Sequence, residues 1–211
     1  MTLRRRHPLW SLWFATPLWL LAVLLSMVFS DCSGGSADRV AAPRPAAYPR
    51  ILLYDTLRYA VSEAAPLLFY ANASATVSRT PGGDGDSRWL NIAYPRYNAV
   101  VYCTFTPVTD ANRAKVLDNR LERMGLNAGG HSSEALTLDS PGGFHSQLIV
   151  TPAESLTPLQ FLSTDGNEWV VSGAAYLDYA PSAAAADSIA PVIDALKADL
   201  LYALERLTVE K

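Results

Sequence analysis

The stretch "RWLNIAYPRYNAVVYCTF" (residues 88–105) carries the clearest structural signal in the chain. In its second half, Ala99, Val101, Cys103 and Phe105 fall on one face of an extended chain and the residues between them on the other. This period of two is typical of a β-strand. Residues 89–94 supply a partner strand, and "PRYN" supplies the turn, because Pro95 lacks the N–H that a sheet ladder requires. The stretch therefore predicts an antiparallel hairpin.

Segments on both sides of the hairpin predict further strands. They are rich in aromatic and β-branched residues and are bounded by turn residues. The last two are joined by "DGN", which is a hairpin turn signal. The expected strands lie near 50–54, near 67–78, and at 144–151, 158–164 and 168–179.

Residues 109–125 change to a helical period, with apolar residues three and four positions apart. Asp110 is expected to begin this helix, and Gly125 is expected to end it. Residues 127–143, "NAGGHSSEALTLDSPGG", are then expected to be a loop with at most one helical turn.

The C-terminal segment "DSIAPVIDALKADLLYALERL" (187–207) has an amphipathic helical pattern, with Asp187 at the cap and Pro191 in the first turn. Successive strands with only two helices predict an α+β fold. In this fold a mainly antiparallel β-sheet has its helices packed on one face. Residues 48–211 are long enough for one such domain, which follows a signal or anchor segment.

The N-terminus is typical of an exported protein. Three arginines at positions 4–6 precede an uncharged apolar run that ends at residue 29. Three outcomes are open: cleavage before Cys32 with lipid added to it, ordinary cleavage after Ser30, or an uncleaved helix that spans the bilayer. All three place the following domain outside the cytoplasm.

Lipidation is the outcome that the following residues favour. Asp31 is unusual before a lipidated cysteine, but residues 33–47 are small and contain proline, as expected of a flexible tether. The chain is therefore divided into a lipoprotein-type signal peptide (1–31), a lipidated cysteine with its tether (32–47), and the folded domain. A fatty acyl group such as palmitate on Cys32 would anchor the domain to the membrane.

Composition argues against several classes of function. The net charge is −3, and a mildly acidic chain is a poor ligand for nucleic acid. Two cysteines, Cys32 and Cys103, do not make a disulfide framework or a zinc site. His131 and His145 are not at metal-ligand spacing, and no GxSxG motif is present. No catalytic residue, metal or cofactor is therefore expected.

A few residues remain as candidates for a site. Tyr94, Arg96 and Tyr97 suggest a surface that binds an anion or a partner, although an ordinary arginine at a hairpin tip explains them too. "DTL" and "DSI" look like the short O-glycosylation motif of the Bacteroidota, with Thr56 and Ser188 as acceptors. Helix capping explains the second motif equally well.

Four ordered blocks together resemble the gliding motility lipoprotein GldD family of the Bacteroidota, over roughly residues 43–208. The blocks are "PRPAAYPRI", "RWLNIAYPRYNAVVYCTF", "LQFLSTDGNEWVVSGAAYLDYAPSA" and "ADSIAPVIDALKADLLYALERL". The resemblance implies lipidation at Cys32 and a membrane-anchored periplasmic domain in the cell envelope. It also implies partners from gliding motility and type IX secretion, and neither enzymatic activity nor a cofactor.

The expected function is therefore that of a noncatalytic assembly or scaffold component. Two alternatives stay open. An exported hydrolase or carbohydrate-active enzyme could use paired carboxylates such as Asp165 and Glu168. A small-ligand-binding envelope protein would need a sizeable apolar cavity.

Overall fold

The structure is a computed structural model. It describes residues 52–55, 58–64, 66–81, 87–153, 155–178 and 183–210. The signal segment, Cys32, the tether and Thr56 lie outside the described residues. Among the described helices, none has the length and apolar character needed to cross a bilayer.

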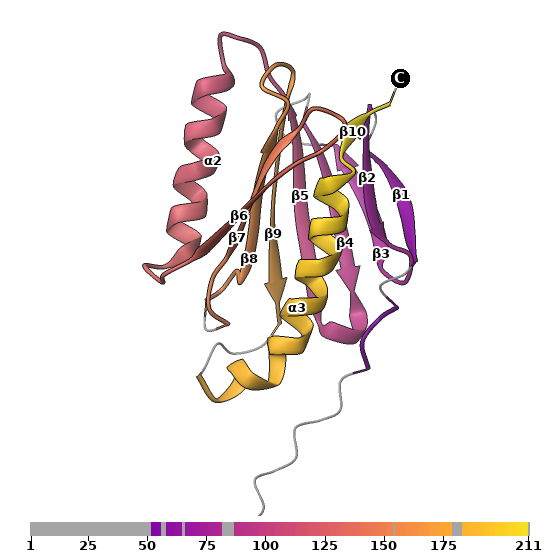
Figure 1. Ribbon diagram of the computed structural model, residues 1–211, viewed down its shortest axis with the longest axis vertical. Coiled ribbons are helices and arrows are strands. Elements are labelled where there is room, and N and C mark those ends of the chain that lie inside the picture. Colours follow the sequence, from indigo (N-terminus) through magenta and orange to yellow (C-terminus); the bar gives the residue numbers. More distant parts are fainter. Residues whose placement is uncertain are drawn as a thin grey trace, which may run out of the picture. The chain divides into compact units, whose positions relative to one another are not determined.

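A seven-stranded antiparallel sheet forms the body of the domain (Figure 1). The hairpin expected over residues 88–105 lies within it, and Tyr94 is paired with Ala99 at the turn. The expected "DGN" hairpin is also present, next to that pair. In spatial order the strands are β3 (Thr76–Pro81), β4 (Arg88–Tyr94), β5 (Ala99–Pro107), β9 (Trp169–Leu177), β8 (Leu159–Thr164), β7 (His145–Val150) and β6 (Glu134–Asp139).

A smaller antiparallel sheet packs on one face of the large one. It consists of β1 (Tyr59–Ala64), β2 (Leu67–Asn72) and β10 (Thr208–Val209), with β2 in the middle. The Phe69 ring lies 5.8 Å from the Phe105 ring and 6.2 Å from the Phe161 ring, centroid to centroid. These contacts place the centre of the main hydrophobic core between the two sheets.

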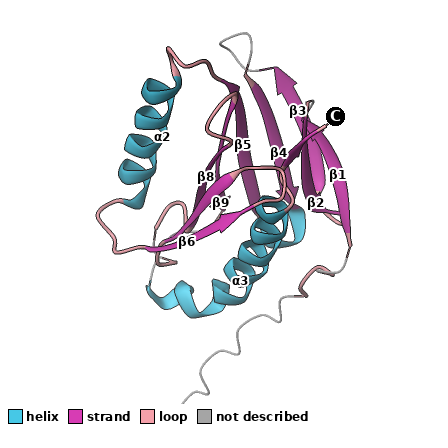
Figure 2. Cartoon of the chain, turned by 45° about the horizontal axis from the view of Figure 1, so that its top comes forward, coloured by secondary structure: helices cyan, strands magenta, loops and turns pink. Residues whose placement is uncertain are grey.

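Two helices complete the α+β fold, and they lie on opposite faces of the large sheet (Figure 2). Helix α3 (Ala183–Glu205) packs on the main core, which contains Phe161. Helix α2 (Arg113–Ala128) packs on Leu162 instead. Neighbouring residues of a strand face opposite ways, so the expectation that both helices share one face is wrong, although the α+β class is confirmed.

Two of the strands expected before the hairpin are placed differently. Residues 52–55 have no regular structure, and β1 follows them instead. The single strand expected near 67–78 is two strands, β2 and β3, which belong to different sheets. The Asn72 side chain makes the turn between them by accepting a hydrogen bond from the Ser74 N–H at 3.0 Å. A short polar turn of this kind interrupts the pairing without a Gly or Pro signal.

Residues 127–143 are expected to be a loop, and this prediction is wrong for residues 134–139, which form strand β6. Helix α2 continues through Gly125 to Ala128, and Gly129, whose φ of 61° is left-handed, caps its C-terminus. Strand β6 then follows. At the other end of the helix, Asn112 takes the cap position, while Asp110 pairs with Arg113.

Helix α3 begins at Ala183, four residues before the expected cap at Asp187. Pro191 consequently lies inside the helix and not in its first turn. The first turns run at an angle to the rest of the helix (Figure 1). A proline inside a helix removes one backbone hydrogen bond and bends the axis in this way.

Candidate functional site

The tip of the β4–β5 hairpin is held rigidly against the end of β9. A 3₁₀ turn at Pro95–Tyr97 leads to Asn98, whose φ is 47°. Asparagine tolerates this left-handed conformation better than most residues. Its carbonyl then accepts a hydrogen bond from the Asp178 N–H at 2.8 Å. The tip therefore presents fixed side chains to its neighbours.

Of the three tip residues that the sequence singled out, only Arg96 is exposed. Tyr94 and Tyr97 are buried, and their rings stack with centroids 5.9 Å apart. Tyr54 from the N-terminal segment packs edge-on against Tyr97, with centroids 4.8 Å apart. The two buried rings are thus part of the core and do not form a free binding surface.

The N-terminal segment is bonded to the hairpin tip in both directions. The Tyr54 N–H donates to the Tyr97 hydroxyl at 2.6 Å, and the Arg96 N–H donates to the Tyr54 hydroxyl at 3.1 Å. The Arg96 guanidinium also lies 4.6 Å from the centre of the Tyr54 ring. This cation–π contact supplies a further attraction. The predicted anion-binding arginine therefore covers a tyrosine.

Below the tip lies Asp199 of α3, a carboxylate that is only 5% exposed. It accepts hydrogen bonds from the Tyr59 hydroxyl at 2.8 Å, the Asn72 amide at 3.4 Å, and the Tyr94 hydroxyl. In the part of the chain that the structure describes, no basic side chain forms an ion pair with it. Burial raises the pKa of Asp199, and its hydrogen bonds oppose that shift.

The neighbouring hydroxyls are also electrostatically perturbed. Burial and the adjacent Asp199 carboxylate raise the pKa of both Tyr59 and Tyr94. The hydroxyls therefore stay protonated and act as donors to the carboxylate. Tyr59 stacks on Tyr202 of α3 with centroids 3.7 Å apart, which holds its hydroxyl in place. The arrangement suits the joining of chain segments that lie far apart in the sequence.

We call this set of residues the tyrosine–aspartate cluster. It joins the N-terminal segment, strand β2, the hairpin tip and the C-terminal helix. Sequence reasoning missed most of its members. One signal was present: Asp199 lies seven residues after Val192 and three after Leu196, so it interrupts the apolar stripe of its helix. The cluster consists of Tyr54, Tyr59, Asn72, Tyr94, Arg96, Tyr97 and Asp199.

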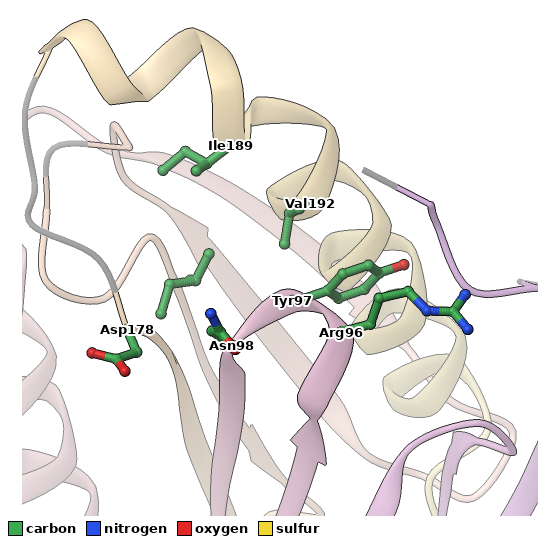
Figure 3. A pocket seen from close by; sticks show the side chains of 7 residues that line it. Arg96, Tyr97, Asn98, Asp178, Ile189 and Val192 are labelled. Carbon is green, nitrogen blue, oxygen red and sulfur yellow. The ribbon is translucent and has the colours of Figure 1, made fainter. Parts of the chain in front are cut away.

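A pocket of about 220 Å³ opens beside the cluster (Figure 3). It lies between the hairpin tip, the end of β9 and the start of α3. Its volume is below the range of about 300–1,000 Å³ that is usual for sites of drug-sized ligands. It is lined by Arg96, Tyr97, Asn98, Leu177, Asp178, Ile189 and Val192.

The other candidate residues have structural roles. His145 pairs with Asp139 at 2.6 Å on the surface, and the described residues contain no group of three metal-ligating side chains. Cys103 is buried in the core, and burial raises the pKa of its thiol. Such a thiol is inert. Ser188 lies half-buried in α3.

At the "DGN" turn, the first carboxylate of the proposed pair is engaged by the backbone of the turn. The Asp165 carboxylate accepts three backbone N–H groups, from Asn167, Glu168 and Trp169, at 2.8–3.0 Å. It thus closes the turn between β8 and β9. Glu168 contributes its backbone to this arrangement.

The family model described as "Gliding motility lipoprotein GldD" matches residues 38–209, which include every element of both sheets and both helices. No curated protein matches the chain. Because the family model covers most of the sequence, the chain belongs to the gliding motility lipoprotein GldD family.

Proposed function

We propose that the chain is a noncatalytic component of an envelope assembly that serves gliding motility and type IX secretion. In this proposal a lipid on Cys32 anchors the protein and its folded domain lies in the periplasm. The observation that carries the proposal is the family match over residues 38–209. That match associates the chain with gliding motility and with a lipoprotein's place at a membrane of the cell envelope.

The tyrosine–aspartate cluster supports the anchoring part of the proposal. The first described residues, 52–55, come soon after the proposed tether and are bonded to the hairpin tip through Tyr54. Tyr59 then bonds to Asp199 of the last helix. A force applied through an N-terminal anchor would therefore act on both the hairpin tip and the last helix. Strand β1 would not be the first element to separate from its sheet.

The character of the buried polar groups supports a noncatalytic role. Three donors surround Asp199, and Asp165 is engaged by its own turn. Neither carboxylate lines the pocket at the hairpin tip. Asp165, one of the two carboxylates that the sequence offered for hydrolysis, is thus engaged in a turn, and Asp199 joins chain segments.

The anchor is tested by a Cys32→Ala variant expressed in the native host. We expect this protein to lack acyl chains and to impair motility. It should leave the membrane fraction if the signal segment is cleaved at another position, and it should be larger than the mature protein if that segment is kept. Two or three acyl chains give stable anchoring, whereas one gives marginal binding. Cys103→Ala is the matched control and should stay in the membrane fraction. A Cys32→Ala protein of unchanged size, fractionation and function would contradict the anchor.

The assembly role is tested by crosslinking the tagged protein in intact envelopes, followed by purification and mass spectrometry. We expect subunits of the motility or secretion machinery to be enriched. The Cys32→Ala variant provides the comparison, because it should recover fewer of them. Recovery of no envelope protein beyond the background of an unrelated tagged lipoprotein would contradict the assembly role.

A further inference from the structure

A second surface lies on the face of the large sheet that α2 partly covers, away from the tyrosine–aspartate cluster. A groove of about 250 Å³ runs there between α2 and strands β5, β8 and β9. Tyr102 and Tyr176 line it and are 48% and 36% exposed, so the groove is open to solvent. We call it the α2 groove. Its lining is Tyr102, Thr104, Arg120, Arg123, Met124, Asn127, Gln160, Phe161, Ser172, Gly173, Ala174 and Tyr176.

The charges of α2 are divided between its two sides. Arg120 and Arg123 line the groove, as does Asn127 one turn further on. At about 100° per residue, Asp118 and Glu122 fall about 160° from Arg120, on the opposite side of the helix. The groove is therefore positive, although the whole chain carries a net charge of −3.

The floor of the groove is fixed by hydrogen bonds between the sheet and α2. Gln160, which is buried, accepts from the Asn127 amide at 3.2 Å and donates to the Met124 carbonyl at 3.3 Å. Arg120 donates to the Thr106 hydroxyl at 3.2 Å. Apolar side chains of α2 pack on Leu162 below. The groove is thus preformed, which lowers the entropic cost of binding.

Exposed aromatic rings extend this surface beyond the groove. Tyr102 and Tyr176 meet edge to face with centroids 5.5 Å apart. Trp89, which is 43% exposed, pairs across the strands with Thr104 and so lies on the same face. Trp89 lies on β4 and Tyr176 on β9, which are two strand spacings, or about 10 Å, apart.

The surface therefore continues from Trp89 across the tyrosines to the arginines of α2. An occupant that reaches from one end to the other must be extended. At about 3.3 Å per residue, six residues of extended polypeptide span about 20 Å, roughly twice the separation of β4 and β9. Exposed aromatic and arginine side chains are also the residue types that are enriched at protein interfaces.

The geometry points to the α2 groove as the binding site for an extended acidic segment of a partner protein. A carboxylate of that segment pairs with Arg123, and its neighbouring side chains lie across Tyr102 and Trp89. Guanidinium groups bind carboxylates through two parallel hydrogen bonds, which fixes both charge and orientation. This inference names the chemistry of a partner and does not depend on the acylation of Cys32.

The test selects binders from a randomised hexapeptide library on the full-length chain in detergent micelles. Enriched sequences are then labelled with fluorescein and measured by fluorescence anisotropy. We expect the enriched peptides to contain Asp or Glu, and replacing that residue by Asn or Gln should weaken binding at least tenfold. Arg123→Gln and Tyr102→Ala should each weaken binding by a similar factor.

The matched control is Lys115→Gln, which removes an exposed positive charge from the other side of α2 and should leave binding unchanged. Arg123→Glu should reverse the preference, so that the peptide with Lys in place of the acidic residue binds more tightly than the original. Arg123 is exposed, and the thermal unfolding of each variant confirms that the fold is kept.

Three results would overturn the inference. One is a library without enrichment over bare micelles. Another is enrichment of peptides that bind Arg123→Gln as tightly as the unchanged protein. The third is direct binding of a fluorescein-labelled acidic oligosaccharide, such as a polygalacturonate fragment, when no peptide binds, which would assign the groove to sugars.

Discussion

Asp199 illustrates how a single residue shapes the electrostatics of this domain. Its carboxylate is withdrawn from water, and three hydrogen-bond donors replace the water. Those donors favour the charged form, but burial outweighs them, so the pKa of Asp199 is raised. A folded state with a raised carboxyl pKa binds its proton more tightly than the unfolded chain does.

Asp199 therefore makes stability depend on pH. Below its unfolded pKa of about 4, the carboxyl is protonated in both states and carries no penalty. As pH rises through the raised folded value, the folded protein must bury a charge and the free energy of unfolding falls. Asp199→Asn should remove this component. The free energy of unfolding is measured by urea denaturation from pH 4 to 8. As pH rises, we expect the value for Asp199→Asn to increase relative to the value for the unchanged protein.

The control for this measurement is Asp178→Asn, which removes a negative charge from an exposed position. Parallel pH profiles for the Asp199→Asn variant and the unchanged protein would show that the buried carboxylate has no such role.

Tyr97 permits a second test at the scale of one atom. Tyr97→Phe keeps the ring but removes the hydroxyl that accepts from the Tyr54 N–H. A lost hydrogen bond of this kind costs about 1 kcal/mol. We expect faster hydrogen exchange at the Tyr54 amide and little change in strands β8 and β9. Tyr54→Phe, which removes the partner of the Arg96 N–H, should instead speed exchange at Arg96. Unchanged hydrogen exchange at both amides would contradict the attachment of the N-terminal segment to the hairpin tip through these hydrogen bonds.

At the scale of elements, the sequence predicts best where pattern and neighbours agree. The β4–β5 and β8–β9 hairpins show two-residue alternation and turn residues, and both are present. Strand β6 is missed because it follows a glycine-rich stretch and, as an exposed edge strand, has only Leu136 and Leu138 as large apolar residues. Gly125 was read as the end of α2, but an exposed helix tolerates an internal glycine, and Gly129 provides the left-handed cap.

The site was harder to predict than the hairpins. The sequence suggests a binding surface at Tyr94 and Tyr97 because they flank Arg96 at a hairpin tip. They are buried because Tyr54 and Asp199, which lie 40 and 105 residues away from Tyr94, pack against them. The local sequence pattern around a residue does not indicate packing partners that lie so far away in the sequence.

Two glycines allow a matched test of packing. A Cβ on Gly173 in β9 would lie 2.4 Å from Cε1 of Phe161 and 2.8 Å from the Tyr102 carbonyl oxygen. Gly173→Ala should therefore destabilise the domain by about 1–3 kcal/mol, because the core cannot expand freely. Gly125→Ala meets nothing within 4 Å and should stabilise α2 by about 0.5–1 kcal/mol. Thermal or urea unfolding measures both, and equal effects would contradict the described packing.

At the scale of the molecule, the described domain separates two kinds of surface. The tyrosine–aspartate cluster fastens the N-terminal segment to the last helix and to the hairpin tip. The α2 groove lies on the other face of the large sheet and remains open. A protein that is tethered through its N-terminus and binds a partner on a second face would use the tyrosine–aspartate cluster for the first task and the α2 groove for the second. This division accords with the proposed role in an envelope assembly.

The central claim is that the mature protein begins at an acylated Cys32. Mass spectrometry of the N-terminal peptide, taken from the protein in its native envelope, tests this claim most directly. We predict a peptide that starts at Cys32 and carries the mass of a diacylglyceryl group, with or without a third acyl chain. An N-terminal peptide with an unmodified Cys32 thiol, or one that retains residues 1–31, would contradict it.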